Sequence, residues 1–294
     1  MAGFYSQLLV GLINGCFYAL LSLGLAVIFG MLNIVNFAHG ALFMTAAFFA
    51  WIGLIQLGPW VGHHDLHVSY WWSLVLVPPI VGLLGATIER WMLRHLYRLD
   101  PLYGMLLTFG IAGILEGLFR HWFGATGRPY EIPDELYGTV NLGFLLLPLY
   151  RVWVVVAALT VCFATWFLIE RTKLGSYLRV ATENPNLVQA FGINVPLMVT
   201  LTYGFGVALA AFAGVLAAPI TQVSPKMGSD LIIIVFAVVV VGGMGSILGS
   251  IVTGLSLGVI EGLTKVVYPE ASAVVIFLIM SVVLMLRPTG LFGR

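Results

Sequence analysis

Long apolar stretches follow one another along most of the 294-residue chain, with short polar segments between them. A helix needs about 20 mostly apolar residues to cross the hydrocarbon core of a bilayer. Scanned at that length, the sequence predicts nine spans, near 7–30, 38–57, 70–90, 102–120, 151–170, 198–220, 231–247, 250–268 and 272–287. We therefore expect an all-α, polytopic transmembrane helix bundle of about 8–9 spans, forming a single transmembrane domain over residues 1–294.

The boundary between the spans near 231–247 and 250–268 is the weakest in this pattern. The run GGMGS at 242–246 separates them. It suits a loop between two spans, but irregular backbone is also tolerated inside a membrane where it lines a cavity. A re-entrant break at 242–246 is therefore the alternative.

Small residues recur every four positions after this run and would form one face of a helix: Ser246, Ser250, Gly254, Gly258 and Gly262. Such a face lets neighbouring helix backbones approach closely in a membrane. Close packing is the expectation, and lining of a path is the alternative.

The composition excludes several classes of protein. Apolar residues make up 61% of the chain and charged residues 9%, and the mean hydropathy is +1.05. A soluble domain is about 25% charged, so a soluble, disordered or disulfide-rich secreted chain is excluded. The net charge of +1 gives no basic field for nucleic acid. Cys16 and Cys162 lie in apolar segments and are expected as buried thiols.

The distribution of Lys and Arg predicts the orientation. With the N-terminus outside and the C-terminus in the cytoplasm, the inner loops hold Arg90, Arg94, Arg98, Arg171, Lys173, Arg179, Arg287 and Arg294. The outer loops hold Arg120, Arg128, Arg151, Lys226 and Lys265. No Lys or Arg precedes Arg90, so we expect the first apolar stretch to be kept as a span and not cleaved as a signal peptide.

The sequence lacks the motifs of an enzyme. It has no G-x-x-x-x-G-K-[ST] phosphate loop and no Gly-Lys pair, so ATP hydrolysis of that kind must come from a partner chain. His63, His64 and His67 form a weak possible metal site in an outer loop, with no catalytic partners beside them. We expect no catalytic residue, no metal and no cofactor.

Two segments of the chain resemble each other. GMLLTFGIAGILEGL (104–118) and GSIVTGLSLGVIEGL (249–263) align without gaps at an offset of 145 residues. Transporters are often built from repeated halves, here expected at about 1–125 and 150–290. Chance similarity in a chain rich in Gly and Leu is the alternative.

Glu116 and Glu261 occupy equivalent positions in these two segments. Each lies four residues before a basic residue, Arg120 or Lys265, and such pairs interact along a helix. An ion pair near the helix end is the expectation. A role in ion coupling or in binding a substrate ammonium group is the alternative.

NIVNFAHGAL (33–42) is polar for its position between two spans. Polar side chains at membrane depth are costly unless they face protein or a water-filled cavity. We therefore expect this segment to face protein or a water-filled cavity at membrane depth, and an ordinary inner turn between the two spans is the alternative. His39 is expected to be a hydrogen-bonded structural residue, with a proton relay as the less favoured reading.

The expected cytoplasmic loop at 171–197 contains a short helix. Asn184 and Pro185 are typical of a helix start, and Gly192 of a helix end. A helix of two turns is not stable alone in water, so its flanking spans must hold it. We expect it to dock a partner protein, with a simple surface loop as the alternative.

These segments together resemble a known family. FGMLNIVNFAHGALFM (29–44), RVATENPNLVQAFGIN (179–194) and VVVVGGMGSILGSIVTGLSLGVIE (238–261) are similar to the membrane permease of bacterial branched-chain amino-acid ABC importers of the LivH type. The resemblance runs from about residue 5 to 292, including LRPTGLFG at 286–293.

The resemblance implies a multi-pass permease of the bacterial inner membrane that works by alternating access. Its implied partners are a second, related permease subunit, two cytoplasmic ATP-binding subunits, a periplasmic solute-binding protein and the lipid bilayer. It implies a coupling helix that seats on the ATPase, with Thr182, Glu183, Asn184, Ala190, Gly192, Ile193 and Asn194 as docking residues. It also implies a translocation path at Asn33, Asn36, His39, Gly40, Gly242, Gly243, Gly245 and Ser246.

The solute remains open at this point. Branched-chain or neutral amino acids are the first expectation, and urea, amides or other small solutes are the alternative.

The expected cytoplasmic loop at 171–197 departs from the acidic-Ala-Ala coupling motif of other importers. The runner-up mechanism is an ion-coupled secondary transporter that uses Glu116 and Glu261.

Overall fold

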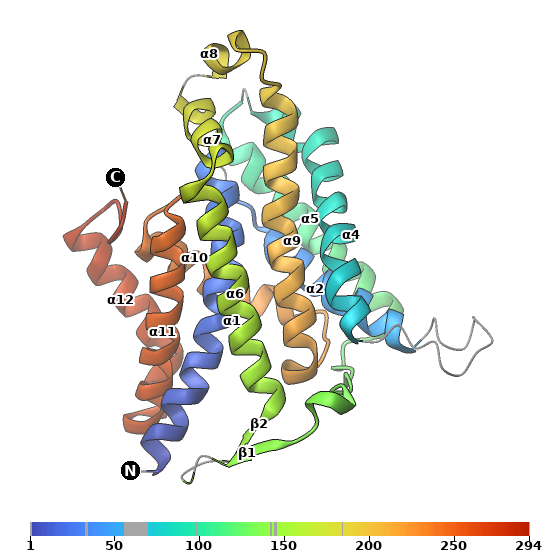
Figure 1. Cartoon of the computed structure of the whole chain (residues 1–294), viewed down its shortest axis with the longest axis vertical. Coiled ribbons are helices and arrows are strands. Elements are labelled where there is room, and N and C mark those ends of the chain that lie inside the picture. Colours follow the sequence, from blue (N-terminus) through green and yellow to red (C-terminus); the bar gives the residue numbers. More distant parts are fainter. Residues whose placement is uncertain are drawn as a thin grey trace. The chain divides into compact units, whose positions relative to one another are not determined.

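The computed structural model describes residues 2–32, 35–55, 70–97, 99–141, 143, 146–183 and 185–293. Nine apolar helices account for most of them (Figure 1): α1 (Ala2–Leu32), α2 (Ala38–Ile55), α4 (Tyr70–Trp91), α5 (Pro101–Phe123), α6 (Leu149–Arg171), α9 (Val195–Thr221), α10 (Met227–Gly242), α11 (Ile247–Val267) and α12 (Ser272–Leu286). Two further helices, α7 (Lys173–Glu183) and α8 (Pro185–Ala190), lie between α6 and α9.

The all-α prediction is confirmed, because every expected span falls on one of these helices. Among the described residues, seven helical segments are long and apolar enough to cross a membrane. The two remaining apolar helices, α2 and α10, are shorter. The helical structure is interrupted between α10, which ends at Gly242, and α11, which begins at Ile247. This is the boundary that was weakest in the sequence pattern.

A small β-hairpin was not predicted. Strands β1 (Thr139–Asn141) and β2 (Leu146–Pro148) pair antiparallel, with Thr139 opposite Pro148. They lie in the segment 121–150 that the sequence assigns to an outer loop. Three-residue strands leave no hydrophobic periodicity to detect. Short 3₁₀ turns complete the described connections: η1 (Leu93–Leu96), η2 (Asp134–Leu136) and η3 (Pro269–Ala271).

The chain divides into two compact units. Unit 1 contains residues 1–26, 134–176 and 233–294, and unit 2 contains residues 27–133 and 177–232. Each unit takes residues from both expected repeat halves. The repeat at 1–125 and 150–290 stays a prediction.

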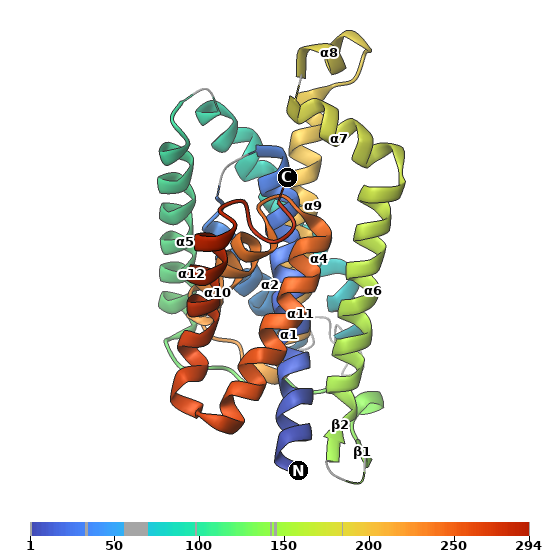
Figure 2. The ribbon, with the colours of Figure 1, turned by 90° about the vertical axis from the view of Figure 1, so that its left-hand side faces the viewer.

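Unit 1 is organised around close contact between α1 and α11 (Figure 2). A Cβ built on Gly258 would lie 2.2 Å from Cα of Gly15, and one on Gly262 would lie 2.7 Å from Cα of Gly11. Real side chains cannot approach so closely, so the two backbones touch only because both helices carry glycine there. The small-residue face expected on α11 is therefore a packing surface against α1.

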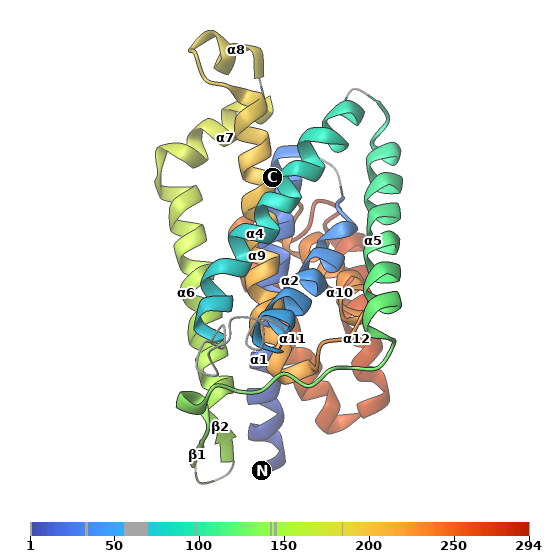
Figure 3. The same ribbon diagram turned by 90° about the vertical axis from the view of Figure 1, so that its right-hand side faces the viewer.

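Unit 2 packs α9 against α4 and α2 (Figure 3). A Cβ on Gly82 of α4 would lie 2.9 Å from the carbonyl oxygen of Gly204 on α9, and one on Gly214 would lie 2.2 Å from that of Phe43 on α2. Arg128 and Val223 exchange two backbone hydrogen bonds of 2.8 Å, which hold the segment after α5 against the end of α9.

Candidate functional site

The segment between α6 and α9 forms two successive helices, α7 and α8. The short helix α8 lies beyond the N-terminal end of α9 in unit 2 (Figures 1 and 2). Its position matches the helix predicted between Asn184 and Gly192, so that part of the prediction is confirmed. Asn184 itself lies outside the described residues.

A Schellman motif ends α8. Gly192 has φ of +80°, its N–H donates to the carbonyl of Gln189 at 2.9 Å, and the N–H of Ile193 donates to that of Val188 at 3.4 Å. These two bonds satisfy carbonyls that the end of a helix leaves without partners. The left-handed φ explains why glycine stands at residue 192.

A small apolar cluster attaches α8 to its neighbours. Val188 of α8 is buried together with Ala181 of α7 and Val195 of α9. On the other side of α8, Leu187 and Phe191 are 49% and 78% exposed. The helix therefore has one side fixed to its own unit and an apolar side that faces outward.

The other docking residues expected from the resemblance have mixed roles. Asn194 caps α9, because its side chain accepts a hydrogen bond of 3.0 Å from the N–H of Leu197. Ile193 packs on the Val188 cluster, and Ala190 is exposed. Thr182 and Glu183 end α7, and their side chains are not described.

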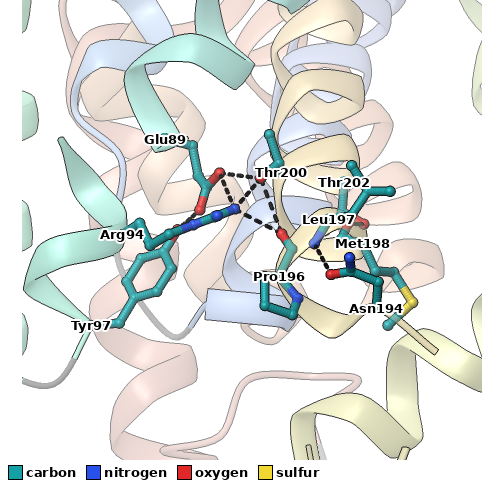
Figure 4. Close-up of polar contacts among 9 residues, drawn as sticks. All are labelled: Glu89, Arg94, Tyr97, Asn194, Pro196, Leu197, Met198, Thr200 and Thr202. Atoms are coloured by element: carbon teal, nitrogen blue, oxygen red, sulfur yellow. Dashed lines mark hydrogen bonds and ion pairs between the residues drawn. The ribbon is translucent and has the colours of Figure 1, made fainter. Parts of the chain in front are cut away.

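A buried carboxylate lies beside the start of α9, and the sequence analysis missed it. Glu89 of α4 is fully buried. Its Oε1 accepts a hydrogen bond of 2.8 Å from the hydroxyl of Tyr97, and its Oε2 lies 2.5 Å from the hydroxyl of Thr200 and 3.4 Å from Nη2 of Arg94 (Figure 4). A buried charge is tolerated only when it is paired and hydrogen-bonded, as here.

Arg94 extends this group of contacts to the first turn of α9. Its Nη2 donates to the carbonyl of Pro196 at 2.9 Å and to the hydroxyl of Thr200 at 2.5 Å (Figure 4). We call Glu89, Arg94, Tyr97, Thr200 and the Pro196 carbonyl the Glu89 cluster. It joins the C-terminal end of α4 and the turn after it to the start of α9.

The Glu89 cluster also changes the pKa of the Tyr97 hydroxyl. Burial, and next the adjacent Glu89 charge, raise the pKa of Tyr97 above its ordinary value, so its hydroxyl stays protonated and keeps donating. In the sequence, Glu89 and Arg90 read only as the polar end of a span. The one signal that could have found the cluster is a carboxylate still within that span and five residues before Arg94.

The expected path residues near the start of α2 are buried. Asn36 and His39 are 1% and 0% exposed, and the Asn36 side chain accepts a hydrogen bond of 3.0 Å from the N–H of Ala38. A Cβ on Gly40 would lie 2.5 Å from the carbonyl oxygen of Gly228, so α2 and α10 approach closely there. Asn33 lies outside the described residues.

The other expected path residues form the turn between α10 and α11. Gly243 and Gly245 have φ of +100° and +84°, and the Ser246 hydroxyl caps α11 by accepting from the N–H of Gly249 at 3.1 Å. The C-terminal segment closes over this turn, because Leu291 and Phe292 donate backbone hydrogen bonds to the last carbonyls of α10. Gly242 packs against Gly249. These contacts belong to turn and cap formation, and a transport role for the turn stays a prediction.

The two repeated carboxylates form the expected ion pairs. Glu116 accepts from Arg120 at 2.8 Å, and Glu261 accepts from Lys265 at 2.6 Å. Glu261 is the more buried of the two and also accepts from the hydroxyl of Tyr18. His63, His64 and His67, the possible metal site, lie outside the described residues.

The chain matches known transport proteins along its length. The family model described as "Branched-chain amino acid transport system / permease component" covers residues 7–284. The chain is 28% identical to the high-affinity branched-chain amino acid transport system permease proteins BraD of Pseudomonas aeruginosa and LivH of Escherichia coli K12, over 99% of this chain and 96% of each relative. It is 29% identical to a probable branched-chain amino acid transport permease protein LivH of Methanocaldococcus jannaschii, over 98% of this chain and 90% of the relative.

No solved structure matches the chain significantly. The family assignment therefore depends on the sequence match, which spans nearly all of the helices described above. Expectation and comparison agree, and the chain belongs to the family of permease components of branched-chain amino acid transport systems.

Proposed function

We propose that this chain imports branched-chain or other neutral amino acids across the bacterial inner membrane, driven by ATP hydrolysis in separate subunits. The observation that carries the proposal is α8, a short helix fixed on one side by Val188 and presenting Leu187 and Phe191 on the other. Leu187 in this short helix and Phe191 directly after it together expose an apolar surface of the kind that marks a contact with a partner protein.

In this proposal α8 is the coupling helix. It docks on one of two cytoplasmic ATP-binding subunits through Thr182, Glu183, Asn184, Ala190, Gly192, Ile193 and Asn194, with Leu187 and Phe191 added to that set on the basis of their exposure. The loop at 171–197 and the C-terminus are cytoplasmic, and the N-terminus is periplasmic. ATP-driven movement of the partner displaces α8, and the attached spans follow.

The remaining partners complete an alternating-access cycle. A periplasmic binding protein delivers the solute from outside, and the solute crosses between this chain and a second, related permease. Asn33, Asn36, His39 and Gly40 contribute to the path together with Gly242, Gly243, Gly245 and Ser246. The chain performs no chemistry on the solute.

A neutral solute is consistent with the charges of the described helices. The carboxylates of Glu89 and Glu261 are each already paired with a base within their own unit. Neither is then available as a fixed negative charge for a cationic solute, and the same pairing of Glu116 and Glu261 weakens the ion-coupled alternative. The relatives from Pseudomonas aeruginosa and Escherichia coli are permease proteins of high-affinity branched-chain amino acid transport systems, which supports that substrate class here.

Reconstitution tests the proposal. Liposomes would contain this chain with its second permease and ATP-binding subunits, with binding protein outside and radiolabelled leucine as the probe. We expect uptake only when ATP and binding protein are both present. Uptake by this chain alone under a pH or sodium gradient would instead identify a secondary transporter, and urea uptake without leucine uptake would identify the other solute class.

A further inference from the structure

We infer that the Glu89 cluster is the mechanical link through which α8 moves α4 and α9 together, which makes Glu89 and Thr200 positioning residues for transport. This inference rests on the proposed coupling role of α8. The cluster is not part of the docking surface, and none of its residues was expected to act in transport.

A short path of packed side chains leads from α8 toward the Glu89 cluster. Val195, the first residue of α9, is buried in the apolar cluster that holds Val188 of α8. Thr200 lies five residues further along the same helix, about 7.5 Å along its axis. A displacement of α8 therefore reaches the first turn of α9 through directly packed side chains.

The Glu89 cluster passes that displacement on to α4. The Pro196 carbonyl belongs to the first turn of α9 and Thr200 to its second turn, whereas Glu89 belongs to the last turn of α4 and Arg94 to η1. Hydrogen bonds to a carboxylate or a guanidinium are short and strong, and the low dielectric of a buried site strengthens them further. The end of α4 must then follow the start of α9.

Helices α4 and α9 do not need the Glu89 cluster in order to stay together. Further along the pair, Gly82 lies against Gly204, and Gly85 lies against Val207. This tight contact should hold the two helices together even when a substitution of Glu89 removes its hydrogen bonds. Loss of the cluster should therefore release one end of the pair and leave the helices associated.

The burial of Glu89 and Thr200 excludes a direct role for them in binding. Glu89 and Thr200 are 0% and 8% exposed, and their polar atoms already contact Arg94, Tyr97 and the Pro196 carbonyl (Figure 4). Groups so enclosed neither dock the ATPase nor meet the solute in this conformation. Their effect on transport must pass through the helices that they join.

The test is the number of solute molecules imported per ATP hydrolysed, measured in the reconstituted complex. We expect Glu89→Gln and Thr200→Val to lower this ratio at least about fivefold, the scale of a typical coupling between sites, while binding protein still stimulates ATP hydrolysis. Thr200→Ser keeps the hydroxyl and should restore the ratio.

A matched control is available on the same helix. Thr202 is as buried as Thr200, and its one described hydrogen bond is to the Met198 carbonyl of its own helix (Figure 4). Thr202→Val should leave the ratio at the wild-type value. If it lowers the ratio as much as Thr200→Val does, the link is not specific to the Glu89 cluster and the inference is wrong.

Two further outcomes would overturn the inference. One is an unchanged ratio in Thr200→Val, which decides the matter even if Glu89→Gln fails to insert in the membrane. The other is a proportional loss of uptake and ATP hydrolysis in line with lower protein abundance, which is what a purely structural role predicts. Failure of the proposed function is distinguishable, because the wild-type complex would then show no ATP-dependent uptake at all.

Discussion

The hydroxyl of Tyr18 on α1 donates a hydrogen bond of 2.7 Å to Oε2 of Glu261 on α11, and Nζ of Lys265 donates to the other carboxylate oxygen. Tyr18 and Glu261 are buried in unit 1, whereas the Lys265 side chain is partly exposed. This geometry predicts that Tyr18→Phe destabilises the protein by about 1 kcal/mol, because a buried carboxylate loses one of its two donors. The midpoint of thermal unfolding in detergent measures the effect.

Glu116 provides the control, because its pair with Arg120 is similar in spacing but more exposed. Exposed pairs contribute little, so Glu116→Gln should change the stability by less than about 0.5 kcal/mol. Equal effects of Tyr18→Phe and Glu116→Gln would contradict the role assigned to the buried hydrogen bond.

Local patterns in the sequence predicted the elements that depend on neighbouring residues. The 20-residue apolar stretches located the spans, Pro185 and Gly192 delimited α8, and the four-residue spacing from Glu261 to Lys265 predicted their ion pair. Each of these signals reports a contact or conformation within one turn or one helix, where sequence spacing and spatial distance correspond.

Contacts between distant segments left no such signal. Glu89 and Thr200 are 111 residues apart in the sequence, and Tyr18 and Glu261 are 243 apart. No periodicity links such positions, so the Glu89 cluster and the Tyr18 hydrogen bond became visible only in the folded chain. The cap on α9 was missed for a different reason, since Asn194 was considered only as a docking residue.

Gly258 and Gly113 occupy equivalent positions in the two similar segments, but their surroundings differ. A Cβ on Gly258 would lie 2.2 Å from Cα of Gly15, whereas one on Gly113 would have nothing within 4 Å. Gly258→Ala must therefore separate α1 and α11, and we expect a loss of about 1–3 kcal/mol. Gly113→Ala should be neutral or slightly stabilising, since alanine favours the helix.

Thermal unfolding of the two alanine variants in detergent measures this difference directly. A Gly113→Ala variant as unstable as Gly258→Ala would mean that the face of α5 is covered by another part of the protein in solution. A Gly258→Ala variant with wild-type stability would contradict the close contact between α1 and α11.

Gly192 ends α8 with φ of +80°, which a β-branched residue rarely adopts. Gly192→Val should cost about 1–2 kcal/mol locally, enough to unfold a helix of six residues. We expect insertion in the membrane to be unchanged and stimulation of ATP hydrolysis by loaded binding protein to be lost. Bulky replacement of the exposed Ala190 should have the same effect by blocking the docking surface.

Gly192→Asn separates backbone strain from side-chain volume, because asparagine tolerates a left-handed φ better than valine does. We expect this variant to retain most of the stimulation. If Gly192→Val and Ala190→Trp both leave the stimulated ATP hydrolysis unchanged, α8 is not the coupling helix.

Labelling of single cysteines tests the orientation on which the proposed mechanism depends. Phe191, next to α8, and Tyr137, between η2 and β1, are both 78% exposed and are placed on opposite sides of the membrane by the distribution of Lys and Arg. A membrane-impermeant maleimide should label Phe191→Cys only in inverted vesicles and Tyr137→Cys only in spheroplasts. The native Cys16 and Cys162 are buried and should give a low background.

The reverse result would place α8 in the periplasm, where no ATP-binding subunit could reach it. The same reversal would move the N-terminus to the cytoplasm, because both assignments follow from one alternation of spans. Labelling of Phe191→Cys from both sides would instead indicate leaky or mixed vesicles. The control for this is the wild-type complex with a tag on its cytoplasmic ATP-binding subunit. Access of an added protease to the tag would reveal vesicles that are leaky or wrongly oriented. Only labelling confined to inverted vesicles is compatible with a coupling role for α8.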